Sequence, residues 1–506
     1  MKKSLALFFV FLILCQGMFL SCASDKTTES NNRISDESDN DNSFGDRIAP
    51  DIPESNFDGY KFTILVNSCS ETNVNLNDFH AEEITSVAIN DAIYNRRLKV
   101  ENMLNVSIED VETTEAKDGA AKEYIITDVK AGTGAYDLAS IAGYAAASLS
   151  QENYLVDLKT VPYINLEADW WDQTANRDLT ILDQLFFTTG EITTSDNDAT
   201  YCILFNKQIR EDNSLENPYE LVNGGKWTID KFIEMASTIS KDLDGNGKYD
   251  ENDQYGALIW DDTMMGIINA SGERCVTIND EGLLELTLNT EKTINVIEKF
   301  LNFAENEKVA LPYQRIEYTD SLLINMFSQD QALFVTQLIK TAPKLRDMDT
   351  NFGILPFFKY DEVQNQYYSP ISSFFSVFVC IPNAQKNVTR TGIVTEALAN
   401  ESLYGGLTEA YYDRTLKGIT TRDRESQEML DLIFANRIYD LGWFYGVGEY
   451  HESVMDMLRY KNNNFASMYK STLRYANRAI QLINDTYTDS KIVREMAEAA
   501  AKNQQK

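Results

Sequence analysis

The chain has 506 residues, a net charge of −33 and 43% hydrophobic residues. A single compact core rarely reaches this length, so two or more lobes are expected. The negative charge argues against nucleic acid or an anionic lipid surface as the partner, because both would repel the protein. It suits a neutral or cationic ligand.

The first 22 residues predict export from the cell. Lys2 and Lys3 precede an apolar run, Leu5–Cys15, which is too short for a membrane-spanning helix of about 20 residues. The run leads to Phe19-Leu20-Ser21-Cys22, which resembles a bacterial lipoprotein signal with Cys22 as the lipid-modified residue. Residues 1–21 are therefore predicted to be a signal peptide. Ordinary secretion, with Cys22 unmodified, is the alternative.

Residues 22–57 are predicted to be a lipid anchor followed by a disordered acidic tether. This segment is rich in Ser, Asn, Asp and Glu and has little apolar surface to bury, so burial does not offset the entropy of ordering it. Anchor, tether and folded body in this order predict a protein held by lipid on the extracellular face of the cell membrane.

Besides Cys22, the cysteines Cys69, Cys202, Cys275 and Cys380 remain after processing. They are widely spaced and form no His/Cys pattern typical of zinc sites. Buried free thiols are predicted, with one or two disulfides as the alternative in an exported protein.

The folded body begins with strand and helix patterns in alternation, at residues 61–66, 91–104, 106–111, 124–130 and 136–141. This order predicts βαβ units and a mainly parallel sheet. Ligand residues on such sheets come from loops after the strands, so Asn67–Glu71 and Gly143–Tyr144 are cleft candidates.

The segment Ile181–Lys207 is predicted to cross from one lobe to the other. Its two strand-like apolar runs, 184–189 and 200–206, are joined by a connection of small, polar and acidic residues. The connection is placed on the wall of the cleft between the lobes, where small ligands usually bind. The alternative is a long hairpin within one domain.

The remainder of the chain mixes helices and strands and ends in helices. Helices are predicted at 227–243, 295–307, 428–440 and 465–483, and strands at 332–336, 352–357 and 374–381.

The twelve residues Asp242–Asp253 fit the calcium loop of an EF-hand. Gly247 stands at the sixth position, where the chain must turn sharply, and the last ligand is Asp rather than Glu. We predict a structural Ca²⁺ ion, with an acidic turn that holds no ion as the alternative. The predicted ligands are the side chains of Asp242, Asp244, Asn246, Asp250 and Asp253 and the carbonyl of Lys248.

Tryptophans beside carboxylates suggest a sugar site. Trp171 precedes Asp172, Trp260 precedes Asp261, and Trp443 lies in a Gly-rich segment. A flat ring packs against the C–H face of a sugar, and carboxylates accept hydrogen bonds from its hydroxyls. For any single tryptophan, core packing is the alternative.

Signals of catalysis are few, and we predict that the protein is not an enzyme. The chain has only two histidines, His80 and His451, and lacks GxSxG, P-loop and GxGxxG motifs. Its many carboxylates leave a glycosidase pair open.

The chain resembles the extracellular solute-binding lipoproteins of carbohydrate ABC transporters. The matching pieces, in order, include FDGYKFTILV, INDAIYNRRLKVENMLNVSI, YDLASIAGY, LVDLKTVPYINLEADWWDQ, LFFTTGEITTSDNDATYCILFNK, NGGKWTIDKFIEMASTISKDLDGNGKYDENDQYG, LRDMDTNFGILPFFKYDEVQNQYYSP and RDRESQEMLDLI. The resemblance implies an α/β, two-lobe periplasmic-binding-protein fold of type 2, with a cleft between the lobes, a helical C-terminal region and no catalysis.

On this basis lobe 1 is expected at residues 58–190 plus about 371–425, and lobe 2 at 191–370 plus about 426–506. The resemblance implies ligand contacts by Tyr144, Asp196, Asp198 and aromatic residues such as Trp260, to which the tryptophan argument adds Trp171 and Trp443.

The expected function is capture of a carbohydrate, an oligosaccharide in our hypothesis, by a monomer that delivers it to ABC permease subunits. The alternatives are a lipoprotein that binds oligopeptides or cationic solutes, and a surface glycan hydrolase or sensor.

Overall fold

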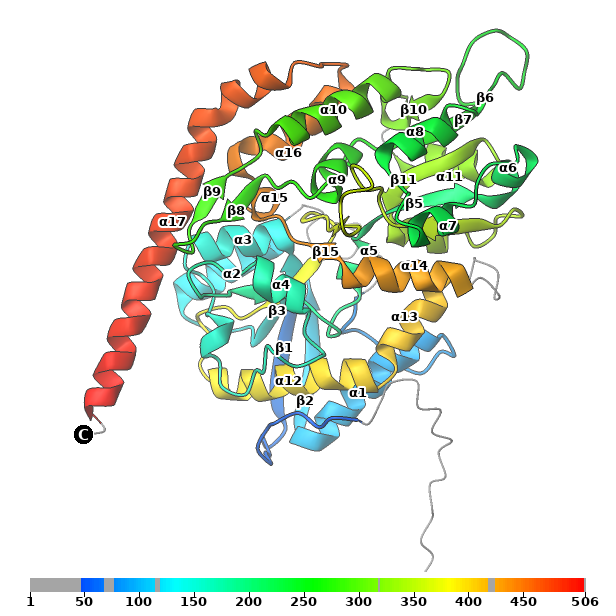
Figure 1. The fold of residues 1–506 in the computed structure, drawn as a ribbon. Helices are drawn as coiled ribbons and strands as arrows, with labels where there is room; N and C mark the ends of the chain where they lie inside the picture. Colours follow the sequence, from blue (N-terminus) through cyan, green and yellow to red (C-terminus); the bar gives the residue numbers. More distant parts are fainter. Residues whose placement is uncertain (1–46, 68–76, 114–118, 317–318, 417–423, 505–506) are drawn as a thin grey trace, which may run out of the picture. The chain divides into compact units, whose positions relative to one another are not determined.

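The computed structural model describes residues 47–67, 77–113, 119–316, 319–416 and 424–504 (Figure 1). The signal peptide, Cys22, most of the tether and Ser68–Glu71 of the first cleft loop lie outside the described residues. By its contacts the chain divides into Met1–Arg47 and Ile48–Lys506, and the second unit is the folded body.

The first sheet forms lobe 1 and has the strand order β2-β1-β3-β14-β4. β1, β2 and β3 are parallel, whereas β14 runs antiparallel to β3 and β4. Phe62 and Ile64 of β1 belong to one apolar cluster and Leu65 to another, because successive side chains point to opposite faces of a strand. The strands are β1 (Tyr60–Val66), β2 (Val106–Glu112), β3 (Leu138–Ala142), β4 (Phe187–Thr188) and β14 (Val377–Cys380).

Helices and turns complete this lobe. α1 packs on α12 and α13, and α2 packs on α3. Their bounds are α1 (Ala88–Leu104), α2 (Ala120–Ala131), α3 (Gly143–Gln151), η1 (Leu158–Thr160), α4 (Gln173–Asp178), α12 (Val388–Tyr404) and α13 (Leu407–Leu416).

The second sheet forms lobe 2, with the order β10-β7-β11-β5-β12 and β6 paired to β7. All side chains of β5 and β11 are buried, as expected for central strands. The strands are β5 (Tyr201–Asn206), β6 (Ser240–Lys241), β7 (Gln254–Ile259), β10 (Ala310–Pro312), β11 (Ala332–Leu338) and β12 (Phe352–Leu355). A separate hairpin pairs β8 (Val276–Ile278) with β9 (Leu284–Leu286).

The helical segments of this part are short, apart from α10. They are α6 (Lys207–Asp212), α7 (Pro218–Asn223), α8 (Ile229–Ala236), α9 (Thr263–Ala270), α10 (Glu291–Ala304), η2 (Tyr313–Arg315), α11 (Asp320–Ser328) and η3 (Ile339–Leu345).

The segment Ile181–Lys207 connects the two sheets. β4 pairs with β14 in the first sheet, and β5 pairs with β11 and β12 in the second. The connection between them contains the short helix α5 (Ser195–Asp198). The two strands do not form a hairpin with each other, so the crossover prediction is confirmed. A second junction pairs β13 (Ser369–Pro370) with β15 (Arg437–Ile438) in parallel.

The C-terminal region is helical, as predicted. α17 contacts η4, α16, β9 and α3 (Figure 1). The elements are α14 (Arg424–Ala435), α15 (Leu441–Phe444), η4 (Val447–Glu449), α16 (Tyr450–Arg459) and α17 (Phe465–Gln504). Among the described residues, no helix is long and apolar enough to cross a membrane.

Several predicted elements have different bounds, and the helix predicted at 465–483 continues to Gln504. Three other differences have a cause in the pairing of strands or the position of a loop. The helix predicted at 227–243 ends at Ala236, because the chain then turns and pairs with β7 through β6. The helix predicted at 428–440 ends at Ala435, because Arg437 and Ile438 form strand β15 and pair with β13. The strand predicted at 374–381 begins only at Val377, which leaves Phe374 and Phe375 in the loop before it.

Two further predictions concern the tether and the cysteines. The last part of the predicted tether contacts the body: Ile52 and Phe57 pack against the lobe 1 core, and the Phe57 amide donates to the Leu104 carbonyl at 2.9 Å. Burial of two apolar side chains favours order in this stretch. Cys202, Cys275 and Cys380 are buried free thiols, as predicted, and Cys69 lies outside the described residues.

Candidate functional site

A row of aromatic rings joins two of the predicted ligand residues. Tyr144 stacks on Phe374 with 5.6 Å between ring centroids, and Phe374 meets Phe375 edge-on at 5.0 Å. Phe375 lies 5.7 Å from Trp260, which stacks on Tyr201 at 5.7 Å. We call these five residues the aromatic row.

The aromatic row runs from one lobe to the other. Tyr144 begins α3 directly after β3 of the first sheet, and Trp260 follows β7 of the second. Both therefore stand after the carboxyl ends of parallel strands, where ligand residues are expected. Phe374 and Phe375 belong to the loop that returns the chain from lobe 2 to β14. Trp260 and Tyr201 are buried, whereas the other three rings are half-buried.

Charged groups lie against the aromatic row. The Lys340 ammonium is 3.7 Å from the centroid of the Phe375 ring, and the Tyr201 hydroxyl donates to Asp262 at 3.4 Å. Burial lowers the pKa of Lys340 to about 8, and the nearby Lys344 acts in the same direction. Burial and the neighbouring Asp261 raise the pKa of Asp262 well above its usual value. The site thus combines flat apolar faces with a hydrogen-bond donor and an acceptor.

Trp443 lies close to the aromatic row without a ring contact to it. Its carbonyl accepts from the Ser373 hydroxyl at 3.4 Å, next to Phe374 in the chain. The indole itself is buried and donates to the Asn269 side chain at 2.7 Å. Its immediate role in this structure is to tie α15 to α9.

Trp171 is separate from the row and packs in lobe 1. Its indole N–H donates to Glu396 at 3.0 Å, and that of Trp170 donates to the same carboxylate at 3.1 Å. Trp171 is 2% exposed, so in this structure it is a core residue.

Asp196 and Asp198 each form an ion pair with an arginine from a later part of the chain. Arg437 donates to Asp196 at 2.7 Å and to Asp172 at 2.9 Å. Arg414 donates to Asp198 at 2.7 Å. Both aspartates are buried, and their contacts fix the connection between β4 and β5 rather than present free carboxylates.

Sequence reasoning missed several residues of this site. Phe374 and Phe375 were assigned to a buried strand, although a pair of phenylalanines between Ser373 and Ser376 breaks the alternation of a half-buried strand. Lys340 carries no sequence signal, because its place beside Phe375 depends on the pairing of β11 in the second sheet.

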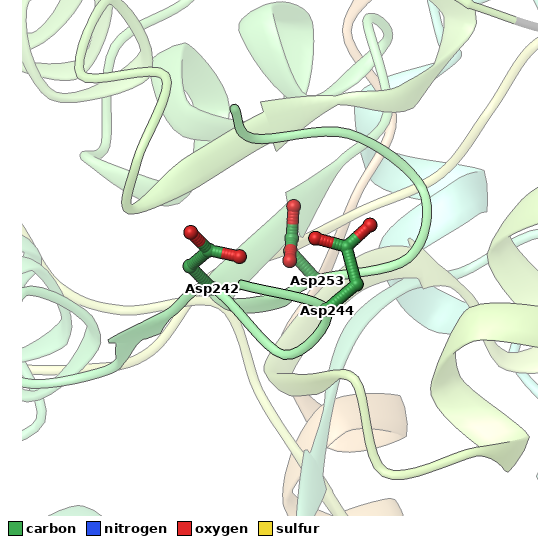
Figure 2. A group of neighbouring side chains, drawn as sticks. All are labelled: Asp242, Asp244 and Asp253. Atoms are coloured by element: carbon green, nitrogen blue, oxygen red, sulfur yellow. The ribbon is translucent and has the colours of Figure 1, made fainter. Parts of the chain in front are cut away.

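The predicted calcium loop lies between β6 and β7. One carboxylate oxygen from each of Asp242, Asp244 and Asp253 lies within 4.8 Å of the other two, and Figure 2 shows the three side chains on this loop. Gly247 has φ +77°, a left-handed conformation that glycine adopts at no steric cost. Asp242 accepts from the amides of Gly245 at 2.7 Å and Gly247 at 2.8 Å, which lowers its pKa and keeps it ionised. The donor set therefore fits a hard cation such as Ca²⁺.

No protein-family model and no curated protein matches the chain. Solved structures do match over most of its length. A sugar transporter protein of Rhizobium etli in an open conformation has a TM-score of 0.56 at 12% identity and covers 84% of this chain and 99% of its own. A cyclo/maltodextrin-binding protein with maltotetraose reaches 0.55 at 13% identity, covering 84% and 96%. A solute-binding protein of Thermotoga lettingae with α-D-tagatose reaches 0.53 at 14%, covering 84% and 100%.

The chain has the fold of ABC-transporter solute-binding proteins. The two-lobe α/β architecture predicted from the sequence is thereby confirmed. The aromatic row connects Tyr144, which follows β3 of the first sheet, with Trp260, which follows β7 of the second.

Proposed function

We propose that the protein captures a carbohydrate outside the cell and delivers it to the permease of an ABC transporter. The observation that carries the proposal is the aromatic row, which starts on lobe 1 at Tyr144 and ends on lobe 2 with Trp260 and Tyr201. Two of the similar structures hold sugars, maltotetraose and tagatose.

The row and its charged neighbours account for sugar recognition in chemical terms. The half-buried rings of Tyr144, Phe374 and Phe375 offer apolar faces to the C–H side of a pyranose. Asp262 and Lys340 offer an acceptor and a donor for hydroxyl groups. A ligand that touches groups of both lobes favours the arrangement in which they are close, so binding and closure are coupled.

The first test is a thermal-shift screen of the purified protein against mono- and oligosaccharides. A ligand at 100 times its Kd stabilises the folded state by about 2.7 kcal/mol, which raises the melting temperature measurably.

Phe375→Ala is expected to reduce sugar affinity about tenfold, from the loss of about 1.5 kcal/mol of ring contact. Tyr460→Ala, at a ring that is 75% exposed, is the control and should bind as the parent does. Sugar binding that is equal in both variants would contradict the assignment.

Two other functions remain as outcomes of the same screen. Stabilisation by cationic peptides or polyamines, with no response to sugars, would favour a receptor for cationic solutes, in keeping with the net charge of −33. Consumption of an oligosaccharide, abolished by one carboxylate substitution, would favour a glycan hydrolase over a protein that binds without catalysis.

We also propose that lipid on Cys22 holds the protein, as a monomer, on the outer face of the cell membrane. The support is the signal sequence, in which Ser21 precedes Cys22 after a short apolar run. Cys22→Ala should move the protein from the membrane fraction to the culture medium, while Cys69→Ala should not. Membrane retention of the Cys22 variant would contradict the anchor.

For the loop Asp242–Asp253 we propose a structural Ca²⁺ ion. Support comes from the convergence of three carboxylate oxygens and from the left-handed Gly247. Extracellular loops bind Ca²⁺ with dissociation constants of about 10⁻⁴–10⁻³ M, which suffices outside the cell. A bound ion would hold the turn between β6 and β7.

A chelator tests the calcium proposal. It should lower the melting temperature of the parent protein, and Asp242→Ala should abolish this sensitivity. Asp280→Ala, in the tip of the β8–β9 hairpin, is a matched control that should respond to the chelator like the parent. A parent protein that melts at the same temperature with and without Ca²⁺ would contradict the proposal.

A further inference from the structure

A cavity of about 470 Å³ lies apart from the aromatic row. Its walls come from the segment between Arg177 and Asp183 of lobe 1, from the β8–β9 hairpin of lobe 2, and from Tyr439 and Leu441 after β15. No residue of the aromatic row lines it. Its volume falls within the range of about 300–1,000 Å³ that is common for small-molecule sites.

Both lobes close around this cavity. The Leu182 amide of lobe 1 donates to the Gly282 carbonyl at the tip of the hairpin, at 3.2 Å. A molecule in the cavity would therefore touch lobe 1, lobe 2 and the strand segment that joins them.

Arg274 is the cation of this cavity that makes no ion pair at contact distance, although Asp440 and Asp178 attract it from farther away. Within the part of the chain that the structure describes, no ion pair within 4.0 Å involves it, and one of its N–H groups donates to the Glu273 carbonyl at 3.1 Å. Its guanidinium lies 5.6 Å from the centroid of the Tyr368 ring, a contact that orients it. The residue is half-buried, so water screens its charge only in part.

The other charges of the cavity are already paired. Arg177 binds Asp178 at 2.8 Å, and Lys159 binds Asp183 at 2.7 Å. Asp440 also attracts Arg274, but its oxygens accept from the Cys275 amide at 2.7 Å and from the Asn269 side chain at 2.8 Å. Among the described residues, Asp178 and Asp440 thus attract Arg274 without accepting a hydrogen bond from it.

A planar guanidinium with free N–H groups matches the paired oxygens of a carboxylate or a phosphate. Apolar side chains on the same walls, Val276, Ile278 and Leu441, suit the carbon part of a small organic acid or phosphate ester. No side-chain acceptor lies within hydrogen-bond distance of Arg274 among the described residues, so a bound anion would complete the hydrogen bonds of its guanidinium.

We propose that this cavity is a second ligand site, distinct from the sugar site, and that it binds a small carboxylate or phosphate through Arg274. Because the occupant touches both lobes, its binding favours the lobe arrangement seen in this structure.

The test is isothermal titration of the full-length protein with inorganic phosphate and, separately, with succinate, at constant ionic strength set by chloride. Saturable binding of at least one of the two anions is expected. The titration that shows binding tells whether the natural ligand is a phosphate or a carboxylate. Arg274→Gln should weaken that binding about tenfold or more, since it removes a charged hydrogen-bond donor.

Two controls make the result specific. Arg210→Gln removes an arginine of α6, paired with Glu211 at 2.9 Å outside the cavity, and should leave anion binding unchanged. Phe375→Ala alters the aromatic row and should also leave it unchanged. The proposal is overturned if neither anion binds saturably, if Arg274→Gln binds as the parent does, or if Phe375→Ala abolishes anion binding.

Discussion

Glu396 is a buried carboxylate that accepts hydrogen bonds from the indoles of two tryptophans and from the Asn165 amide. Among the described residues no lysine or arginine lies within 4.0 Å of it, and the indoles of Trp170 and Trp171 are its side-chain donors. Burial raises its pKa to about 7, and the indole donors counteract only part of this effect. The folded state therefore holds the Glu396 proton more tightly than the unfolded chain does.

This difference predicts a pH dependence of stability. The raised pKa stabilises the fold fully below about pH 4.5, and this contribution is lost as pH rises through about 7. Glu396→Gln does not titrate, so the free energy of unfolding of the parent minus that of the variant should fall by about 3 kcal/mol between pH 4.5 and 8. Urea unfolding at several pH values measures it. A difference that stays constant with pH would show that folding does not shift the pKa of Glu396.

Arg437 is the residue on which the crossover depends most. It is buried and binds Asp172 and Asp196 as well as Asn197. Burial lowers its pKa, but Asp196 and Asp172 outweigh burial and raise the pKa, so the guanidinium stays charged. Arg437→Met would leave two buried carboxylates without their cation.

We expect Arg437→Met to lower the free energy of unfolding by about 3–5 kcal/mol, measured by urea denaturation. Arg424→Met provides the comparison, because Arg424 makes an exposed pair with Glu428 on α14. Such pairs contribute about 0.3–0.5 kcal/mol. Equal, small effects of the two substitutions would mean that the crossover does not need the arginine.

At the scale of elements, the same crossover depends on close backbone packing at Gly190. Its backbone pairs with Trp171, and a Cβ at this position would lie 2.4 Å from the Trp170 carbonyl oxygen. Gly190→Ala should therefore force the two segments apart and cost about 1–3 kcal/mol of stability.

The comparison for this prediction is Gly224→Ala at the end of α7. There the nearest atom to a new Cβ is the Glu220 carbonyl oxygen at 3.1 Å. We expect its melting temperature to stay close to that of the parent and that of Gly190→Ala to fall by several degrees. A Gly190→Ala protein that melts like the parent would show that Trp170 and Trp171 shift easily.

Elements with a clear hydrophobic period were predictable from the sequence. β1, α1 and β2 lie within a few residues of the expected ranges, because their apolar spacing matches one buried face. The end of α8 was not predictable in this way: Ile239 continues the apolar spacing, but the chain leaves the helix to pair with β7. The strand β15 has only two residues, too few to show a hydrophobic periodicity in the sequence. Only its pairing with β13 defines it as a strand.

Tyr144 was predicted from the strand that precedes it, and Trp260 from the carboxylate beside it in the sequence. The structure places both in the aromatic row, and their contact with a ligand stays a prediction. Asp196 has the same polar character in the sequence as a ligand residue, yet a distant arginine, Arg437, neutralises it. Contacts between residues so far apart in the chain leave no local trace in the sequence.

At the scale of the whole molecule, α17 links the two lobes. Asn484 exchanges two hydrogen bonds with the backbone of Leu284 in lobe 2, at 2.9 and 3.0 Å. One turn later, the Tyr487 carbonyl accepts from Gln184 of lobe 1 at 2.8 Å, and Arg494 donates to Asp157 of lobe 1 at 2.7 Å. The contacts to both lobes thus lie within about 15 Å of one continuous helix.

A helix held on both sides resists relative movement of the lobes, because movement must break one set of contacts or bend the helix. The contacts of α17 to lobe 1 are the hydrogen bonds of Tyr487 and Arg494 and an edge-on ring contact of Tyr487 with Phe186. Ala476, Ile480 and Ile483 are buried in the apolar core. Polar contacts near the surface contribute less than apolar burial, so we expect the lobe 1 side to release first.

The double variant Tyr487→Phe, Arg494→Gln weakens the lobe 1 side. It removes the Tyr487 hydroxyl, which donates to Ser150 of lobe 1 at 3.3 Å and lies 2.5 Å from that of Tyr445, and the ion pair of Arg494 with Asp157. Amide hydrogen exchange should become faster over residues 485–496 and stay unchanged over 476–483. Arg478→Gln, at an exposed position of the same helix, should change neither segment. If both segments of the double variant exchange faster, α17 detaches from the two lobes as a whole. If neither segment changes, the packing of α17 against lobe 1 does not depend on these polar contacts.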